Sequence, residues 1–199
     1  MTRAVRASLI LSLCFVSLGC GPSMPSFASS LFEGDDESWV IAGNGDSARP
    51  AFQATGGNGG NGNICATDAL ATDIFYFVAP PRFLGNASAA YGKVLIFDLK
   101  TSSQFMLIKG RDVVLNGGGL ALVQNFKEVP GRDWTPRSFA LDDQSGWRLD
   151  SSTSTGEPAT EDQVRTVLRN LTAIRLRGEF VDGPGDTTCL DNVYFGTTP

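Results

Sequence analysis

Short apolar segments separated by Gly, Asn and Pro turns are the feature that most limits how this chain can fold. Residues 75–78 end at a Pro-Pro pair, and residues 120–126 follow the Gly-rich turn 116–119. These segments have the length of strands, and the residues between them are typical turn formers. About ten such strands with one or two short helices predict an all-β protein, specifically an antiparallel β-sandwich of the jelly-roll type.

Residues 160–171 form the clearest helical segment. Thr160 and Gln163 have the spacing of a capping box, and Val164, Val167 and Leu168 recur on one helical face. A second, shorter helical turn is predicted between residues 82 and 90.

Apolar and charged residues alternate in residues 174–180, which predicts a strand with one solvent-facing side. The charged side carries Arg175 and Arg177. This pair is suited to hold an anionic ligand, and the alternative is an ordinary solvated strand face.

Residues 1–19 have the pattern of an export signal. Arg3 and Arg6 precede an apolar stretch at residues 7–18, which is shorter than the roughly 20 residues that a membrane-spanning helix needs. A buried N-terminal helix is the alternative interpretation.

Two positions are candidates for the end of this signal. Gly19-Cys20 resembles a bacterial lipobox, in which the cysteine becomes lipidated, and residues 20–30 would then be a tether. Cleavage after Ala28 is the competing possibility. We therefore expect a secreted or cell-surface protein, with a possible lipid anchor at Cys20.

The charge balance and the lack of histidine narrow the functional classes. The chain carries a net charge of −5, which becomes −7 when Arg3 and Arg6 leave with the signal. An acidic surface disfavours nucleic acid and anionic membranes, so the only membrane contact expected is the lipid anchor. The chain has 0 histidines, which excludes catalysis by Ser-His-Asp or Cys-His groups.

Only Cys65 and Cys189 lie beyond the signal and its edge. Two cysteines in an exported domain most simply form one disulfide. Two buried free thiols are the alternative.

Acidic residues near the two ends of the domain suggest a cation site. Glu33 and Asp35 lie at its start and Asp191 near its end, and the first and last strands of a sandwich can lie side by side. Calcium prefers such oxygen ligands, so these three residues are candidate ligands for a structural Ca²⁺, although their spacing alone favours solvated turns. Solvated acidic turns are the alternative.

Three further patterns bear on ligands. Trp134 lies between polar residues and is the tryptophan expected to be exposed for stacking on a sugar ring. Residues 57–62 match G-x-G-x-x-G, but no helix-like sequence follows, so a Gly/Asn loop is favoured over nucleotide binding. Paired carboxylates could serve a glycosidase, although no single pair stands out.

The ordered set of segments resembles the laminin IV (laminin B) domain family. The resemblance covers nearly all of residues 31–196 and rests on several matching segments. These are residues 32–35 with Trp39, 75–80, 83–85, 90–92, 95–99, 112–115, 118–120, Trp147, 168–172, 174–179 and 190–193.

The resemblance implies a non-catalytic extracellular jelly roll related to carbohydrate-binding modules, in which a structural calcium often joins the first and last strands. We therefore expect a binding module at residues 31–196 that recognises a glycan or a surface or matrix protein. A structural envelope or matrix protein is the second hypothesis, and a carboxylate-based glycoside hydrolase is the third. The chain lacks the Cys-rich repeats that flank this domain in laminins, so a basement-membrane role does not follow.

Overall fold

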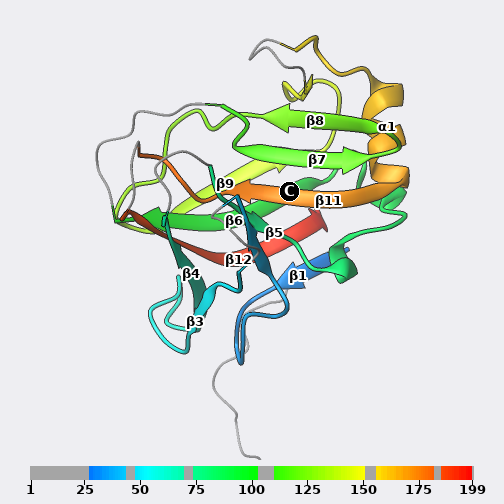
Figure 1. The fold of residues 1–199 in the computed structure, drawn as a ribbon. Helices are drawn as coiled ribbons and strands as arrows, with labels where there is room; N and C mark the ends of the chain where they lie inside the picture. The colour runs from blue at the N-terminus through cyan, green and yellow to red at the C-terminus, as the bar shows by residue number, and fades with distance from the viewer. Residues whose placement is uncertain are drawn as a thin grey trace, which may run out of the picture.

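The computed structural model describes residues 27–43, 48–69, 74–102, 110–150, 156–181 and 185–198. It consists of two six-stranded antiparallel sheets (Figure 1). Sheet A has the order β3-β4-β12-β6-β9, with β1 paired to β12. Sheet B has the order β10-β8-β7-β11-β5-β2.

The strands of sheet A are β1 (Ala28–Ser30), β3 (Ala51–Gln53), β4 (Asn63–Thr67), β6 (Val94–Thr101), β9 (Thr135–Ala140) and β12 (Thr187–Thr197). The strands of sheet B are β2 (Val40–Ala42), β5 (Tyr76–Val78), β7 (Val113–Gly117), β8 (Leu120–Gln124), β10 (Arg148–Leu149) and β11 (Leu171–Arg177). The predicted all-β antiparallel sandwich is confirmed.

Alternation along the strands places the core between the sheets. In β6, Leu95, Phe97 and Leu99 are fully buried in the core, whereas Asp98 and Lys100 point to the other face. The outer face of sheet A therefore carries polar side chains opposite an apolar interior.

The helix α1 (Glu161–Arg169) begins at the predicted capping box. The Gln163 backbone N–H donates to Thr160 Oγ1, and the Thr160 N–H donates to Gln163 Oε1. Figure 1 shows this helix beside the ends of β7 and β8. The second predicted helical region consists of two short 3₁₀ turns, η1 (Pro81–Phe83) and η2 (Ser88–Ala90).

The N-terminal part of the domain starts earlier than the sequence indicated. Residues 28–30, which were predicted to belong to the tether, form β1 and pair with Val193–Phe195 of β12. The Phe27 N–H donates to the carbonyl of Phe195. The predicted signal at residues 1–19 and the lipidation candidate Cys20 lie outside the described residues.

The charged side of residues 174–180, which the sequence placed in solvent, is partly buried in a cluster of charged side chains. Arg177 is fully buried, with its guanidinium donating to Asp112 Oδ1 over 3.2 Å and to the Gly110 carbonyl over 3.0 Å. Glu179 is 2% exposed and accepts a hydrogen bond from the Phe75 N–H. Alternation alone could not predict this burial, because Asp112 comes from a distant part of the chain.

Burial raises the pKa of Glu179 to about 7, and the charges of Asp68 and Asp186 act in the same direction. The folded state therefore binds this proton more tightly than the unfolded chain does. The stability that comes from the protonated form is fully present below the unfolded pKa of 4.5 and is lost as the pH rises through about 7.

In the parent protein, the free energy of unfolding is expected to fall by an amount on the order of 2 kcal/mol as the pH rises from 4.5 to about 7. We predict that this pH dependence is much weaker in Glu179→Gln. Urea unfolding at several pH values measures it. The exposed Glu157→Gln is the matched control and is expected to retain the slope of the parent protein. An unchanged slope in Glu179→Gln contradicts the prediction.

Candidate functional site on the outer face of sheet A

Loop 56–62, which joins β3 to β4, lies against the outer face of sheet A. A Cβ atom on Gly57 would lie 2.6 Å from Asp191 Oδ2, and one on Gly62 would lie 2.0 Å from the carbonyl oxygen of Phe32. Both positions therefore require glycine for this close approach. No helix begins in residues 57–62, so the G-x-G-x-x-G match is a loop without the helix N-terminus that a nucleotide phosphate needs.

Two carboxylates hold this loop to the sheet. Asp98 of β6 and Asp191 of β12 are opposite each other in the strand register. The Asn58 N–H donates to Asp191 Oδ2 over 2.7 Å, and the Asn58 side-chain amide donates to Asp98 Oδ2 over 2.9 Å. Asn58 thus connects the loop to both central strands.

Asn192 completes the same cluster from the bulge in β12. Its backbone N–H donates to Asp191 Oδ1 and its side-chain amide donates to Asp98 Oδ2. Asn192 has a positive φ of 49°, and the register shifts between Asp191 and Tyr194. The bulge directs the amide toward the carboxylates.

The cluster concentrates negative charge out of water. Asp191 is fully buried and Asp98 is 6% exposed. Burial raises the pKa of Asp191 to about 7; the Asn192 and Asn58 amides act against this shift, and the charge of Asp98 adds to it. A proton or a cation would relieve the repulsion between the two carboxylates.

Trp134 lies on the same face, just before β9. Its indole N–H donates to the Gly56 carbonyl over 3.1 Å, and the Lys100 ammonium donates to the same oxygen over 3.1 Å. The Lys100 nitrogen lies 4.3 Å from the centroid of the Trp134 ring. Trp134 is half-buried rather than exposed as expected, whereas Trp39 and Trp147 belong to the core.

The predicted disulfide joins Cys65 of β4 to Cys189 of β12. The two residues are direct register partners, and Lys100 is the partner of Cys189 on its other side. The bond therefore covalently links two neighbouring strands beside the Trp134 and Lys100 pair.

A hollow of about 280 Å³ lies next to the disulfide. Its lining combines aliphatic and polar side chains from sheet A, from the segment before β3 and from β2 of sheet B. The lining residues are Ile41, Ala48, Arg49, Ala51, Gln53, Cys65, Ala66, Thr67 and Thr187.

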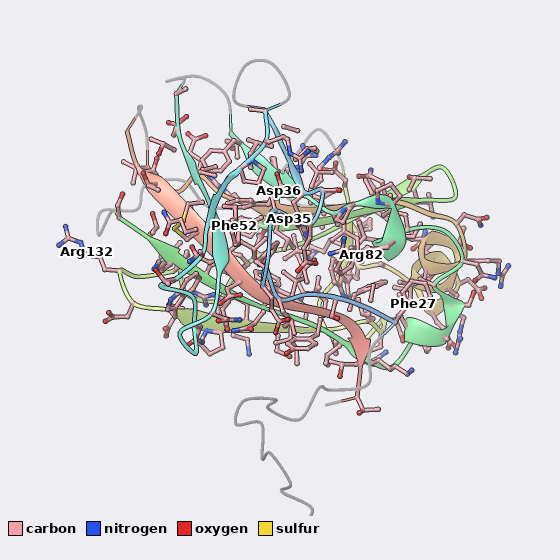
Figure 2. All side chains as sticks on the ribbon, turned by 90° about the horizontal axis from the view of Figure 1, so that it is seen from below. Phe27, Asp35, Asp36, Phe52, Arg82 and Arg132 are labelled. Carbon is pink, nitrogen blue, oxygen red and sulfur yellow. A yellow bond between two sulfur atoms is a disulfide. The ribbon has the colours of Figure 1, made fainter. Side chains whose placement is uncertain are left out.

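The acidic N-terminal segment organises its own loop. Glu37 Oε1 accepts the N–H groups of Leu31 and Phe32, and Asp35 Oδ1 accepts the Glu37 N–H. Glu33 is exposed. Figure 2 shows Asp35 close to its neighbour Asp36 in this segment.

Two arginines neutralise this segment. Asp36 pairs with Arg49 and Glu37 pairs with Arg82, and hydrogen bonding by Arg49 lowers the pKa of Asp36. Within the part of the chain that the structure describes, no three His, Cys, Asp or Glu side chains form a group able to hold a metal ion. The predicted ligands Glu33, Asp35 and Asp191 are therefore not assembled into one set there, and calcium binding stays a prediction.

Sequence reasoning identified Asp191 with its neighbour Asn192, Trp134 and the two cysteines, but it missed the roles of Asp98, Lys100 and Asn58. Alternation in β6 was the available signal for Asp98 and Lys100, because both lie between fully buried residues. No local pattern indicated that Asn58 and Asn192 would meet across a sequence separation of 134 residues.

The profile of the laminin B (domain IV) family matches residues 76–198. The chain belongs to this family. The match covers β5 to β12 and includes Asp98, Trp134 and Asp191. The laminin domain IV family is non-enzymatic.

Sequence similarity to known laminins agrees with this family assignment. Laminin subunit gamma-2 from Equus caballus is 32% identical over 133 residues, which cover 64% of this chain but 10% of that protein. This laminin B domain thus spans about a tenth of the length of that relative. The activities and partners of whole laminins therefore cannot be assigned to this chain from the match.

Two solved structures share the fold. The L4b domain of human laminin alpha-2 superposes with a TM-score of 0.67 at 10% identity, covering 84% of this chain and 96% of that domain. CtCBM11 has a TM-score of 0.55 at 14% identity, covering 86% of this chain and 96% of its own. Among the described residues of this laminin B domain, no helix has the length and apolar character to cross a membrane.

We predict that the Cys65–Cys189 bond contributes about 4–5 kcal/mol to the free energy of unfolding, because it closes a long segment of the unfolded chain. The double variant Cys65→Ser/Cys189→Ser is expected to show this loss in urea unfolding. Mass spectrometry after alkylation without reduction should find neither thiol labelled in the parent protein. Two labelled thiols would exclude the bond.

The calcium prediction has a direct thermal test. Because Asp191 is one of the three predicted ligands, we expect Ca²⁺ to raise the Tm of protein that was first treated with a chelator. Asp191→Asn should remove this increase, while Glu157→Gln, which changes an exposed acid, should retain it. Equal Tm values with chelator and with Ca²⁺ would exclude calcium as part of the fold.

Proposed function

We propose that this domain is a non-catalytic extracellular binding module and that the outer face of sheet A around Trp134 contacts a glycan. The observation that carries the proposal is the Trp134 ring, which is held half-buried on a strand face next to polar side chains. A fixed aromatic ring offers an apolar surface to the C–H face of a sugar.

The surroundings of Trp134 suit sugar hydroxyls. The Lys100 ammonium lies against the ring, and the amide groups of Asn58 and Asn192 occupy the same face. Because their positions are already held by hydrogen bonds to Asp98 and Asp191, little ordering would be needed on binding. The likeness of the fold to CtCBM11 supports the same class of ligand.

An extracellular location is part of the proposal. It is supported by the export pattern at residues 1–19, by the disulfide, which persists in oxidising compartments, and by membership in a laminin domain family. The lipid anchor at Cys20 is retained as a proposed mode of attachment to a surface.

A structural role in an envelope or matrix is the second candidate. It is favoured because the polar groups beside the Trp134 ring are already bonded within the chain. The Trp134 indole N–H and the Lys100 ammonium both donate to the carbonyl of Gly56. A glycoside hydrolase is less well supported, since the Asp98 and Asp191 carboxylates are buried and already accept hydrogen bonds from Asn58 and Asn192.

The test is a glycan array followed by affinity measurements with Trp134→Ala. We expect the parent protein to bind one class of glycan and Trp134→Ala to lose affinity by at least about tenfold, or about 1.4 kcal/mol, because the stacking surface is gone. Phe27→Ala is the matched control, since Phe27 is an aromatic residue with 39% exposure at another place on the molecule (Figure 2).

Equal affinities of the parent protein and Trp134→Ala would remove the Trp134 face from the binding site. An array without any bound glycan, together with a matrix-protein pull-down that depends on Trp134, would assign protein recognition instead. If neither the glycan array nor the pull-down detects binding, the structural role is favoured.

A further inference from the structure

The outer face of sheet B carries a continuous row of side chains across all six strands. Direct register pairs join each residue of the row to the next, from the β2 edge to the β10 edge. In order, the row is Val40, Val78, Arg175, Val114, Val123 and Arg148. With neighbouring strands about 4.8 Å apart, it is roughly 24 Å long.

Alternation assigns this row to the face away from the core. The sequence neighbours Ile174 and Leu176 are in the core on either side of Arg175, and Leu122 is in the core beside Val123. Val40 at one end of the row is 38% exposed. Val78, Arg175 and Val123 are half-buried and Arg148 is exposed, whereas Val114 is 1% exposed. The row therefore presents apolar side chains with Arg175 among them and Arg148 at one end.

The two arginines of the row have no carboxylate partner among the described residues. The Arg175 guanidinium donates to Asn116 Oδ1 over 3.2 Å, and that of Arg148 donates to the Gly156 carbonyl over 2.7 Å. Both acceptors are neutral groups rather than carboxylates. Three strand spacings, or about 14 Å, separate the two positions.

Two acids near this face are paired with arginines. Asp112 pairs with the buried Arg177, and Asp150 pairs with Arg111. Tyr76 lies among these groups: burial raises the pKa of its hydroxyl, and the positive charges of Arg177, Arg111 and Arg175 oppose the shift. Arg175 and Arg148 thus place positive charge on this face of a protein whose net charge is negative, with the exposed Glu157 on the segment that bonds to β10.

We propose that the outer face of sheet B binds an anionic polysaccharide, with Arg175 and Arg148 pairing with carboxylate or sulfate groups. Guanidinium groups bind both anions through paired hydrogen bonds. The half-buried side chains of Val78 beside Arg175 and of Val123 beside Arg148 offer apolar surface to the C–H faces of sugar rings. An extended chain with repeated charges matches two cations about 14 Å apart on a flat strip better than a small anion does.

This site is separate from the Trp134 face, because the two lie on opposite outer faces of the sandwich. Trp134→Ala therefore leaves anionic binding unchanged if both proposals hold. Loss of one activity without the other distinguishes failure of this inference from failure of the proposed function.

The experiment measures the affinity of the full chain for heparin, polygalacturonate, neutral dextran and polyglutamate at about 50 mM and about 500 mM salt. We expect binding to heparin or polygalacturonate, which identifies sulfate or carboxylate as the anion, and weaker binding at high salt. Arg175→Ala and Arg148→Ala should each weaken this binding by at least about fivefold.

Arg132→Ala is the charge-matched control, because Arg132 is exposed and precedes β9 of the other sheet; Figure 2 shows it at the opposite side of the view from Phe27. It should change affinity by less than about twofold. Arg175→Lys retains the charge without the paired hydrogen bonds and is expected to bind with intermediate affinity. If Arg175→Ala has a lowered Tm, its loss of affinity could come from unfolding, and Arg175→Lys then serves as the test variant.

Three results would overturn the proposal. The first is no binding to either anionic polysaccharide. The second is an equal loss in Arg132→Ala and Arg175→Ala, which indicates only general charge attraction. The third is equal affinity for dextran or polyglutamate, which would replace the anionic polysaccharide with a neutral glycan or an acidic polypeptide.

Discussion

The pairing of β12 with three other strands is the constraint on which the rest of the structure depends. This C-terminal strand pairs with β6 along one edge, and with β4 and β1 along successive parts of the other. It therefore joins segments from the start, the middle and the end of the chain. The Cys65–Cys189 bond makes one of these pairings covalent. Residues 27–30 also depend on β12, since they form a strand only against its last residues.

The same strand explains why the polar cluster of sheet A exists. A bulge after Asp191 turns the Asn192 amide toward Asp98, while Gly57 allows the loop backbone to approach Asp191 closely. Burial of two facing carboxylates is costly unless their oxygens accept hydrogen bonds. Asn58 and Asn192 provide these bonds, so the loop and the bulge stabilise each other through the carboxylates.

The two outer faces differ in chemistry because their exposed strand positions differ. Sheet A presents Lys100, Trp134 and the amide-bearing loop, which suits a neutral sugar. Sheet B presents valines with Arg175 and Arg148, which suits a charged chain. Both surfaces rest on the same apolar core, so side-chain changes on one face need not disturb the other.

The sequence by itself determined the class of fold, the helix and the disulfide. Alternation in β6, the Thr160–Gln163 capping box and the two remaining cysteines are local or compositional signals, and each has a direct physical cause.

Only the tertiary structure decided where charges are buried and which residues meet. Alternation placed Arg177 and Glu179 in solvent, but both are buried, and Arg177 is paired with Asp112. Among the described residues, Glu33 and Asp35 do not form a metal-binding group with Asp191. Instead, the Asn58 backbone N–H donates to Asp191 Oδ2 over 2.7 Å. Periodicity describes which side of a strand a residue occupies, but the partner on that side comes from a distant segment. Strand order and register set that partner, and no local pattern in the sequence contains them.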